Sequence, residues 1–288
     1  MGGTHVATIG AMSYPSRFWA DLSTRDFAEA RSWGLAAQTV AVLPVAAVEQ
    51  HGPHLPLNVD ARLLQGVIDA ALALLPPELP VLFLPPQNLG LSTEHQSYPG
   101  TLTLTPATLL ALWCELGECV ARAGIKKLLL FNGHGGNVAP MDIAARELRQ
   151  RCNLLVYSSS WFSLPLPDAV SAQFSAAEHR FGIHGGEIET SMMLHLAPET
   201  VHMEHARDWR STSQDRAERF AILGNGRSAK MGWAMQDYQA AGAVGNAAAA
   251  TAERGRAVVQ AAGQALAQLL GEIHALPLST LAPGPGAP

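Results

Sequence analysis

Residues 39–60 read TVAVLPVAAVEQHGPHLPLNVD, and the rest of the chain is best understood from this stretch. Its first part, 39–48, is almost entirely apolar and is predicted to form a buried strand. Glu49 and His51 follow at the strand end, and side chains two residues apart on an extended chain lie on the same side. Asp60 comes after a turn with two prolines, just before a helical pattern. These residue types indicate a site for a divalent ion such as zinc or manganese. The alternative is a solvated Glu and His at a strand end.

The remaining chain alternates between strand and helix patterns. Further strands are predicted at 80–85, 126–131 and 154–158. Helices are predicted at 18–33, 63–75, 106–123 and 141–152, at the end of 184–196, and at 247–273. This alternation predicts an α/β protein with a mostly parallel sheet that is covered on both faces.

A second candidate ligand lies at the end of another predicted strand. His134 belongs to the loop NGHGGN, residues 132–137, which lacks the pattern of a phosphate-binding loop. Ligands of parallel sheets bind beyond the carboxyl ends of the strands, where Glu49 and His51 are also predicted to lie. We therefore expect the three side chains to meet at one rim, although an ordinary turn with an incidental histidine is the alternative.

The segment 184–196, HGGEIETSMMLHL, contributes a carboxylate on an apolar helix face. In a helix, Glu189 shares one stripe with Met192, Met193 and Leu196. A buried carboxylate is costly unless it is paired or bound to a metal, so Glu189 is predicted to have a partner, either a metal or a buried cation. Glu187 points away from this stripe and is expected to be solvated or to support the site.

Several other polar residues have weaker signals. Glu94 and His95 are interpreted as a polar loop pair, with the alternative that one of them orients a metal ligand. Two cysteines, Cys114 and Cys119, are predicted to lie in a helix core. The histidines without supporting spacing are expected in loops or at the surface; they are His54, His179, His202 and His205.

Composition narrows the classes of function. The 288 residues are 48% hydrophobic and carry a net charge of -5, which argues against nucleic acid as a partner. Three cysteines without a CxxC pair fit a reducing compartment, so a cytoplasmic protein is expected. The start of the chain does not resemble a signal peptide, and no apolar run approaches the roughly 20 residues of a membrane span.

The domain organisation is predicted to be simple. We expect a flexible lead-in at 1–16, a single domain at 17–276 and a Pro/Gly-rich tail at 277–288. The segment 161–179 is predicted to be an irregular loop over the site. The polar excursion at 200–245 is expected to serve a subunit contact or a substrate lid, because it is long for a structureless loop.

Four motifs in order, EQHGPHLPLNVD, STEHQSYPGTLTL, NGHGGN and HGGEIETSMM, resemble the creatininase (creatinine amidohydrolase) family over about residues 19–255. The resemblance implies a three-layer α/β/α sandwich, a two-metal centre and often a homohexamer. The family includes creatininase itself, enzymes acting on formamidopyrimidine intermediates, and a peptidase of redox-cofactor maturation.

The resemblance also implies roles for individual residues. The matches to family metal ligands are Glu49, His51, Asp60 as the bridge, and His134. Glu189 matches a glutamate of the later motif, and His184 a histidine that the family places close to the substrate. The chain departs from creatininase at Gly135 and Gly136, where creatininase has a bulky aromatic residue and a glutamate ligand. We therefore expect a wider pocket, a metal shell that recruits Glu189, and poor activity on creatinine.

The predicted function is hydrolysis of a C–N bond in a small amide, cyclic or linear, by a metal-activated water. Two divalent ions are expected, zinc first, with manganese or iron as alternatives. His184 is predicted to move the proton to the leaving nitrogen, and Glu189 to act in catalysis as well as in metal binding. The expected partners are a small-molecule amide and further copies of the chain, with no nucleic acid and no membrane. The alternatives are a peptidase of the cofactor-maturation type and a metal-binding scaffold without catalysis.

Overall fold

Four parallel strands form the central sheet of the structure, a computed structural model that describes residues 13–285. The strands lie in the order β2-β1-β3-β4, and each neighbouring pair is parallel. Their bounds are β1 Val40–Val45, β2 Val81–Phe83, β3 Lys127–Asn132 and β4 Leu155–Ser160. The predicted α/β fold with a mostly parallel sheet is confirmed.

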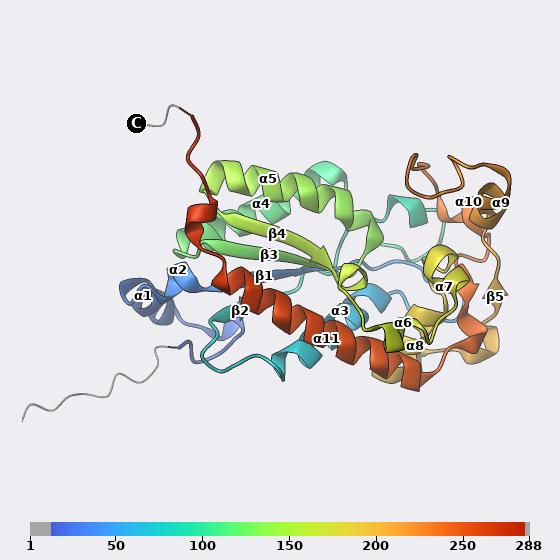
Figure 1. Ribbon diagram of the computed structural model, residues 1–288, viewed down its shortest axis with the longest axis horizontal. Coiled ribbons are helices and arrows are strands. Elements are labelled where there is room, and N and C mark those ends of the chain that lie inside the picture. The colour runs from blue at the N-terminus through green and yellow to red at the C-terminus, as the bar shows by residue number, and fades with distance from the viewer. Residues whose placement is uncertain (1–12, 286–288) are drawn as a thin grey trace, which may run out of the picture.

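Helices cover both faces of this sheet and complete three layers (Figure 1). On one face, Val40 and Val42 of β1 pack with α3, α8 and α11. On the other face, Leu43 and Val45 pack with α4 and α5. Because successive strand side chains point to opposite faces, the continuous apolar run of β1 supplies both cores. The helix bounds are α3 Val59–Leu72, α4 Pro106–Arg122, α5 Val138–Cys152, α8 Glu187–Leu196 and α11 Ala252–Ala275.

The first helix, α1 Thr24–Ser32, begins at a capping box. The Ser23 hydroxyl accepts a hydrogen bond from the Asp26 backbone N–H, and the Asp26 carboxylate accepts one from the Ser23 backbone N–H. The predicted helix start at Phe18 is wrong, because Trp19–Asp21 forms a separate 3-10 turn.

Helix α4 begins at Pro106, as predicted from the sequence. Pro106 occupies the first turn, and the Thr105 hydroxyl accepts a hydrogen bond from the Thr108 backbone N–H. Cys114 is buried, as predicted, but Cys119 is exposed, so its predicted place in the core is wrong. The difference arises because the two cysteines are five positions apart, and the helix turns the second one away from the sheet.

Two helices near the strand ends begin earlier than predicted. Helix α3 starts at Val59 instead of Leu63, so Asp60 lies within its first turn and not ahead of it. Helix α5 starts at Val138 instead of Met141. An acidic side chain in the first turn is favoured by the helix dipole, which helps to keep Asp60 ionised.

The segments expected to be irregular contain short elements. Residues 161–179 include α6 and part of α7, so the prediction of a loop is wrong in part. Residues 200–245 include α9, α10 and β5, which pairs antiparallel with β6. The remaining bounds are α2 Leu35–Gln38, α6 Asp168–Ser171, α7 Ala176–Phe181, α9 Thr212–Arg219, α10 Met235–Tyr238, β5 Asp208–Trp209 and β6 Gly245–Asn246.

The strand order indicates where on the sheet a ligand is expected to bind. From β1 the chain passes through α3 to β2 on one side, and then through α4 to β3 on the other side. The order therefore reverses at β1, and ligands of open α/β sheets bind beyond the carboxyl ends of the strands at such a point. Glu49 and His51 follow β1, and His134 follows β3, at this switch point.

Among residues 13–285, no helix is long and apolar enough to cross a membrane. Most of the predicted flexible lead-in, 1–12 of 1–16, lies outside the described residues, as does the end of the tail, 286–288. The single domain at 17–276 and the homo-oligomer stay predictions.

Candidate metal centre

The structure brings all the predicted site residues together at the carboxyl ends of β1 and β3. They are buried, apart from Glu189, whose side chain is 16% exposed. A further histidine, His95, joins them from the loop after β2. The full set is Glu49, His51, Asp60, His95, His134, His184 and Glu189.

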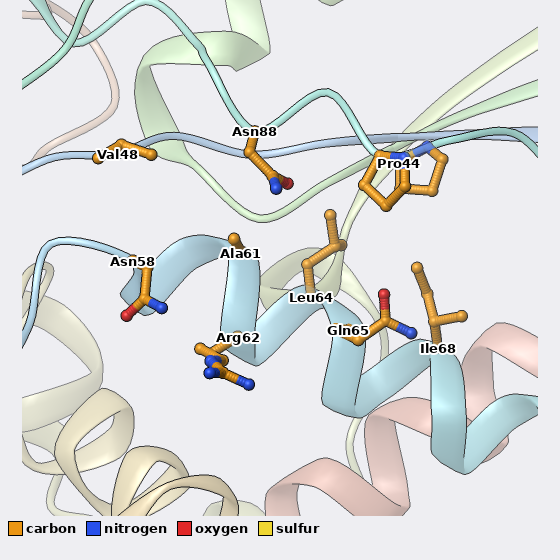
Figure 2. A pocket seen from close by; sticks show the side chains of 10 residues that line it. Pro44, Val48, Asn58, Ala61, Arg62, Leu64, Gln65, Ile68 and Asn88 are labelled. Atoms are coloured by element: carbon orange, nitrogen blue, oxygen red, sulfur yellow. The ribbon is translucent and has the colours of Figure 1, made fainter. Parts of the chain in front are cut away.

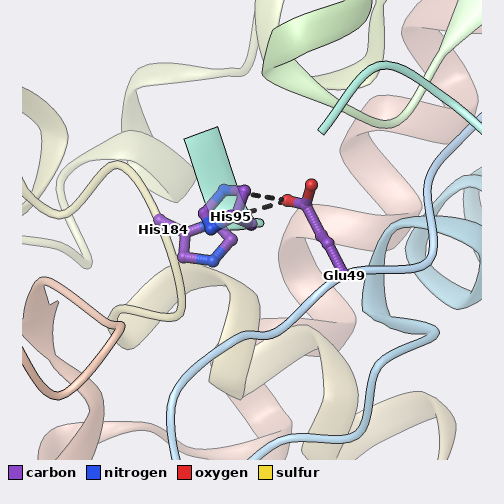
Figure 3. A group of neighbouring side chains, drawn as sticks. All are labelled: Glu49, His95 and His184. Carbon is purple, nitrogen blue, oxygen red and sulfur yellow. Dashed lines mark ion pairs between the residues drawn. The ribbon is translucent and has the colours of Figure 1, made fainter. Parts of the chain in front are cut away.

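The carboxylate of Glu49 lies close to three histidines. Its Oε1 atom is 3.2 Å from Nδ1 of His134 and 3.4 Å from Nε2 of His95. The same oxygen is 3.7 Å from Nδ1 of His184. Figure 3 draws Glu49 with His95 and His184, and dashed lines mark these two contacts. A single carboxylate oxygen therefore faces ring nitrogens from three different segments.

Asp60 lies between two histidines. Its Oδ1 atom is 3.3 Å from Nε2 of His51, and its Oδ2 atom is 3.4 Å from Nδ1 of His134. Each oxygen of one carboxylate thus faces a different imidazole. This arrangement suits a carboxylate that bridges two cations.

The loop NGHGGN is held by its two asparagines. The Asn132 side-chain oxygen accepts a hydrogen bond of 2.9 Å from the His134 backbone N–H. The Asn137 amide donates to the Ala46 carbonyl at 3.0 Å, and its oxygen accepts from the Leu91 N–H at 3.0 Å. The Nε2 atom of His134 is 2.7 Å from the Leu91 carbonyl, which can only accept. In a neutral His134 ring this leaves the Nδ1 lone pair facing the two carboxylates, as in metal-ligating histidines.

The donor atoms fit a divalent cation. In each of three groups of residues, one donor atom per residue lies within 4.8 Å of the other two. The groups are Glu49, Asp60 and His134; His51, His184 and Glu189; and Glu49, His95 and His184. Within the described chain, Oε2 of Glu49, Nε2 of His51 and Oδ2 of Asp60 are buried without a hydrogen-bond partner. Such atoms cost free energy unless something binds them, and carboxylate and imidazole donors are those of zinc and manganese.

The pKa values show how tightly the charges interact. Burial alone would raise the pKa of Glu49, but the neighbouring His134 lowers it to about 2. Burial would lower the pKa of His51, but Asp60 raises it to about 9. Without metal, protonated histidines offset the buried carboxylates, and a cation would take over that role with release of protons.

Glu189 lies at the site in the predicted helical register. Met192 and Met193 of the same stripe are buried. The Oε2 atom of Glu189 is 3.9 Å from Nε2 of His51 and accepts a 2.6 Å hydrogen bond from the Gly185 backbone N–H. Burial raises the pKa of Glu189 to about 7, so the carboxylate lacks a full complement of positive partners.

Glu187 has a different environment. It is buried and forms an ion pair with Arg254 of α11. The expectation that Glu187 is solvated is therefore wrong, and its pairing leaves Glu189 as the carboxylate of α8 that faces the site.

Two histidines are more central than the sequence indicated. The interpretation of His95 as part of a polar loop pair is wrong, because the ring is buried against Glu49, which agrees with the alternative that it orients a metal ligand. His54 lies in a loop, as predicted, but the alternative position at the surface is wrong, because its side chain is buried and its Nε2 atom is 2.9 Å from the Thr190 hydroxyl. Burial lowers the pKa of both rings to about 4. The one available signal for His54 was its position within the same stretch as Glu49.

The space at Gly136 is filled, so the missing side chain leaves no open space at this position, and the wider pocket stays a prediction. A Cβ atom at this position would lie 2.1 Å from the Leu91 carbonyl oxygen, 2.5 Å from Nε2 of His134 and 2.7 Å from Oε1 of Glu94. A Cβ atom at Gly135 would meet nothing within 4 Å. The missing side chains thus open space at Gly135 only, because the loop after β2 occupies the place beside Gly136.

The excursion at 200–245 packs against the site. The Trp233 ring lies edge-on to the His95 ring, with centroids 6.2 Å apart, and Tyr238 packs on the indole at 4.8 Å. The Tyr98 hydroxyl donates to the Gln239 carbonyl at 3.2 Å, which ties this segment to the loop that carries His95.

A separate pocket of about 290 Å³ lies between α3 and the segment after β2 (Figure 2). Its polar lining residues are Asn58, Arg62, Gln65 and Asn88. None of the candidate metal ligands lines it, so it is distinct from the metal centre.

The chain is similar to proteins of one family over most of its length. The family model for creatininase, described as creatinine amidohydrolase, matches residues 20–270. A creatinine amidohydrolase of Pseudomonas putida is 32% identical over 206 residues, which cover 67% of this chain and 76% of that protein. A mycofactocin precursor peptide peptidase of Mycolicibacterium smegmatis is 32% identical over 164 residues, 56% of this chain and 60% of the peptidase. The match to the peptidase thus spans less than two thirds of its length.

Solved structures show the same architecture. A creatininase structure with manganese has a TM-score of 0.72 and 26% identity, and the match covers 91% of this chain and 100% of that chain. A creatininase variant of the Zn–Zn type has a TM-score of 0.71 and 26% identity, with 91% and 99% covered. Both carry divalent metals of the kind that the donor set described above would bind.

Proposed function

Because the chain belongs to the creatininase family, we propose that it is a metal-dependent amidohydrolase that cleaves a C–N bond of a small amide, cyclic or linear, with a metal-activated water. The observation that carries this proposal is the pair of buried carboxylates, Glu49 and Asp60, that lie among histidines with three polar atoms left unpartnered. Burying such a cluster costs folding free energy, and proteins carry clusters of this kind mainly at functional sites.

The proposed centre holds two ions. Glu49, Asp60 and His134 would bind one of them, and His51, Asp60 and Glu189 the other, with Asp60 shared between them. Bound divalent ions lower the pKa of a coordinated water and polarise a carbonyl oxygen. Zinc is the first expectation for this donor set, with manganese or iron as alternatives.

His184 is the proposed carrier of the proton that reaches the leaving nitrogen. Its ring is stacked between His51 and His95, with centroids 4.1 Å and 4.2 Å away. Burial lowers the pKa of His184 well below the usual value, so the ring is neutral and its Nδ1 lone pair is free, although the same shift makes it a weaker base. Its contact with Glu49 would stabilise the imidazolium that then forms.

A peptidase is the second candidate function, and the similarity to mycofactocin precursor peptide peptidase favours it. Both functions hydrolyse an amide C–N bond and would use the same residues. They differ in the size of the substrate that must reach the centre. A metal-binding scaffold without turnover is the third possibility, and the position of His184 against the candidate ligands argues against it.

The deciding experiment measures hydrolysis by the purified protein after removal of metal and after addition of zinc or manganese. We expect activity to disappear with chelation and to return with metal. The panel should contain cyclic amides, formamides and short peptides, and creatinine is expected to be a poor substrate because Gly135 offers no aromatic side chain. Equal turnover with and without metal would rule out the proposed chemistry, and cleavage of peptides alone would favour the peptidase.

Glu189→Gln is expected to weaken one of the two metal sites and to leave the fold intact. The amide has the same volume but lacks the charge that a cation needs, so affinity for the second ion should fall by more than about 10-fold. A metal titration monitored by calorimetry would measure the loss of affinity for the second ion. Glu253→Gln, at an exposed position of α11, is the matched control and should bind metal normally. Two full metal equivalents with unchanged affinity in Glu189→Gln would contradict this assignment.

A further inference from the structure

Gln50 lies between two histidine rings of the site and contacts both. It is buried, with 6% of its surface exposed. Its side-chain Nε2 atom is 2.7 Å from Nδ1 of His95. Its backbone carbonyl oxygen is 2.7 Å from Nε2 of His184. One residue therefore meets the two stacked rings through two different groups.

The orientation of the Gln50 amide follows from a third contact. Its Oε1 atom accepts a 2.9 Å hydrogen bond from the Gly52 backbone N–H. A side-chain NH2 group cannot accept such a bond, so the oxygen must face Gly52 and the NH2 group must face the rings.

This orientation determines the tautomer of His95. Because the Gln50 NH2 group can only donate, Nδ1 of His95 must accept and carries no proton. The neutral His95 ring then carries its proton on Nε2, the atom that lies 3.4 Å from Oε1 of Glu49. A protonated ring nitrogen has no lone pair for a metal, so His95 can donate to Glu49 but cannot bind the ion.

In His184 the unprotonated ring nitrogen is the one that faces Glu49. The Gln50 carbonyl can only accept, so Nε2 of His184 carries a proton and donates to it. In the neutral ring, Nδ1 is then unprotonated, and it lies 3.7 Å from Oε1 of Glu49. The 3.3 Å contact between Nε2 of His184 and Nε2 of Gln50 joins two donors and is a close approach within the stack, not a hydrogen bond.

We propose that Gln50 is a positioning residue that gives the two stacked histidines different roles. Through its side chain it keeps His95 as a hydrogen-bond donor to Glu49 and outside the metal shell. Through its backbone carbonyl it leaves His184 with an unprotonated Nδ1 directed at the centre. Of the three donor triplets, the one formed by Glu49, His95 and His184 is thereby excluded as a metal site. The link to catalysis rests on the proposed function, but the tautomers do not.

The tautomers can be measured directly by NMR of the full chain labelled with 15N in its histidine rings, as purified and after loading with diamagnetic zinc. Protonated and unprotonated ring nitrogens have well-separated 15N shifts. We expect His95 and His184 both to carry the proton on Nε2, with signals assigned from the variants His95→Asn and His184→Asn. A proton on Nδ1 of His95 in the natural protein would overturn the proposal without any need for a Gln50 variant.

Gln50→Glu is expected to reverse the direction of the hydrogen bond to His95 and to keep the backbone contact with His184. The carboxylate oxygen that replaces Nε2 can only accept, so His95 should gain a proton on Nδ1, while His184 stays protonated on Nε2 because its backbone partner is unchanged. Gln96→Glu, the same change at an exposed position next to His95, should leave both rings as they are. An unaltered His95 signal in a folded Gln50→Glu protein would contradict the role of the side chain.

The activity of the zinc-loaded protein provides a second readout. Gln50→Glu is expected to lose about 10- to 100-fold in metal affinity or turnover, because the neutral His95 ring would no longer donate from Nε2 to the proposed ligand Glu49, and loss of a bond that orients a metal ligand typically costs this much. The two proposals fail in different ways. Predicted tautomers without turnover on any amide would leave the role of Gln50 standing and remove the proposed hydrolase function. Turnover with the opposite His95 tautomer would do the reverse.

Discussion

Asp60→Asn is expected to abolish metal binding and hydrolysis together, with a loss of activity greater than about 100-fold. The side chain is buried, and its two oxygens face His51 at 3.3 Å and His134 at 3.4 Å. Loss of a group that only orients a ligand already costs about 10- to 100-fold, so loss of the shared carboxylate should cost more. Metal content by mass spectrometry and turnover on the best substrate of the panel would measure the effect.

The matched control lies on the same helix. Asp69→Asn makes the same chemical change at an exposed position of α3, where the carboxylate accepts a hydrogen bond from Gln65. This variant should keep its metal and its activity. If Asp60→Asn also retained a full complement of metal, the proposal that Asp60 bridges the two ions would have to be abandoned.

His184→Asn is expected to lower kcat by about 10²- to 10⁴-fold, the usual contribution of a positioned acid–base group, while both ions stay bound. The asparagine amide ends near the place of Nδ1, so it does not reach the Gln50 carbonyl that Nε2 of His184 contacts at 2.7 Å, and it cannot carry a proton to the leaving nitrogen. Single-turnover kinetics on the metal-loaded protein would separate this loss from any change in substrate binding.

His202→Asn is the control for this change, because the His202 side chain is exposed and forms an ion pair with Glu204 at the surface. It should have no effect on kcat. Loss of one metal equivalent in His184→Asn would instead make His184 a ligand, and an unchanged kcat would exclude it from the proton transfer.

The positions of several site residues could be predicted because they depend on local patterns. Glu49 and His51 follow a strand that its apolar run identifies, and His134 follows another. Parallel strands bring such residues to one rim whatever the details of packing. Glu189 could be predicted from helical periodicity, because a carboxylate on an apolar stripe needs a partner.

Other features depend on contacts between segments far apart in the sequence. His95 reaches Glu49 because its loop is held by the Leu91 N–H, which donates to Asn137, and by Tyr98, which donates to the carbonyl of Gln239. No periodicity or local propensity encodes such pairings, so the sequence left open whether His95 belongs to a polar loop pair or orients a metal ligand. The place of Gly136 beside the Leu91 carbonyl has the same origin.

By itself, the sequence determined the layered α/β fold, the rim at which the site lies and the chemical types of most donors, because strand and helix patterns repeat locally and side chains follow them. Only the tertiary structure decided which nitrogen of each ring faces the centre. The amide of Gln50 is oriented by Gly52, and that orientation in turn assigns the proton of His95. These are distances of a few ångströms between loops, and they arise only when the loops pack together.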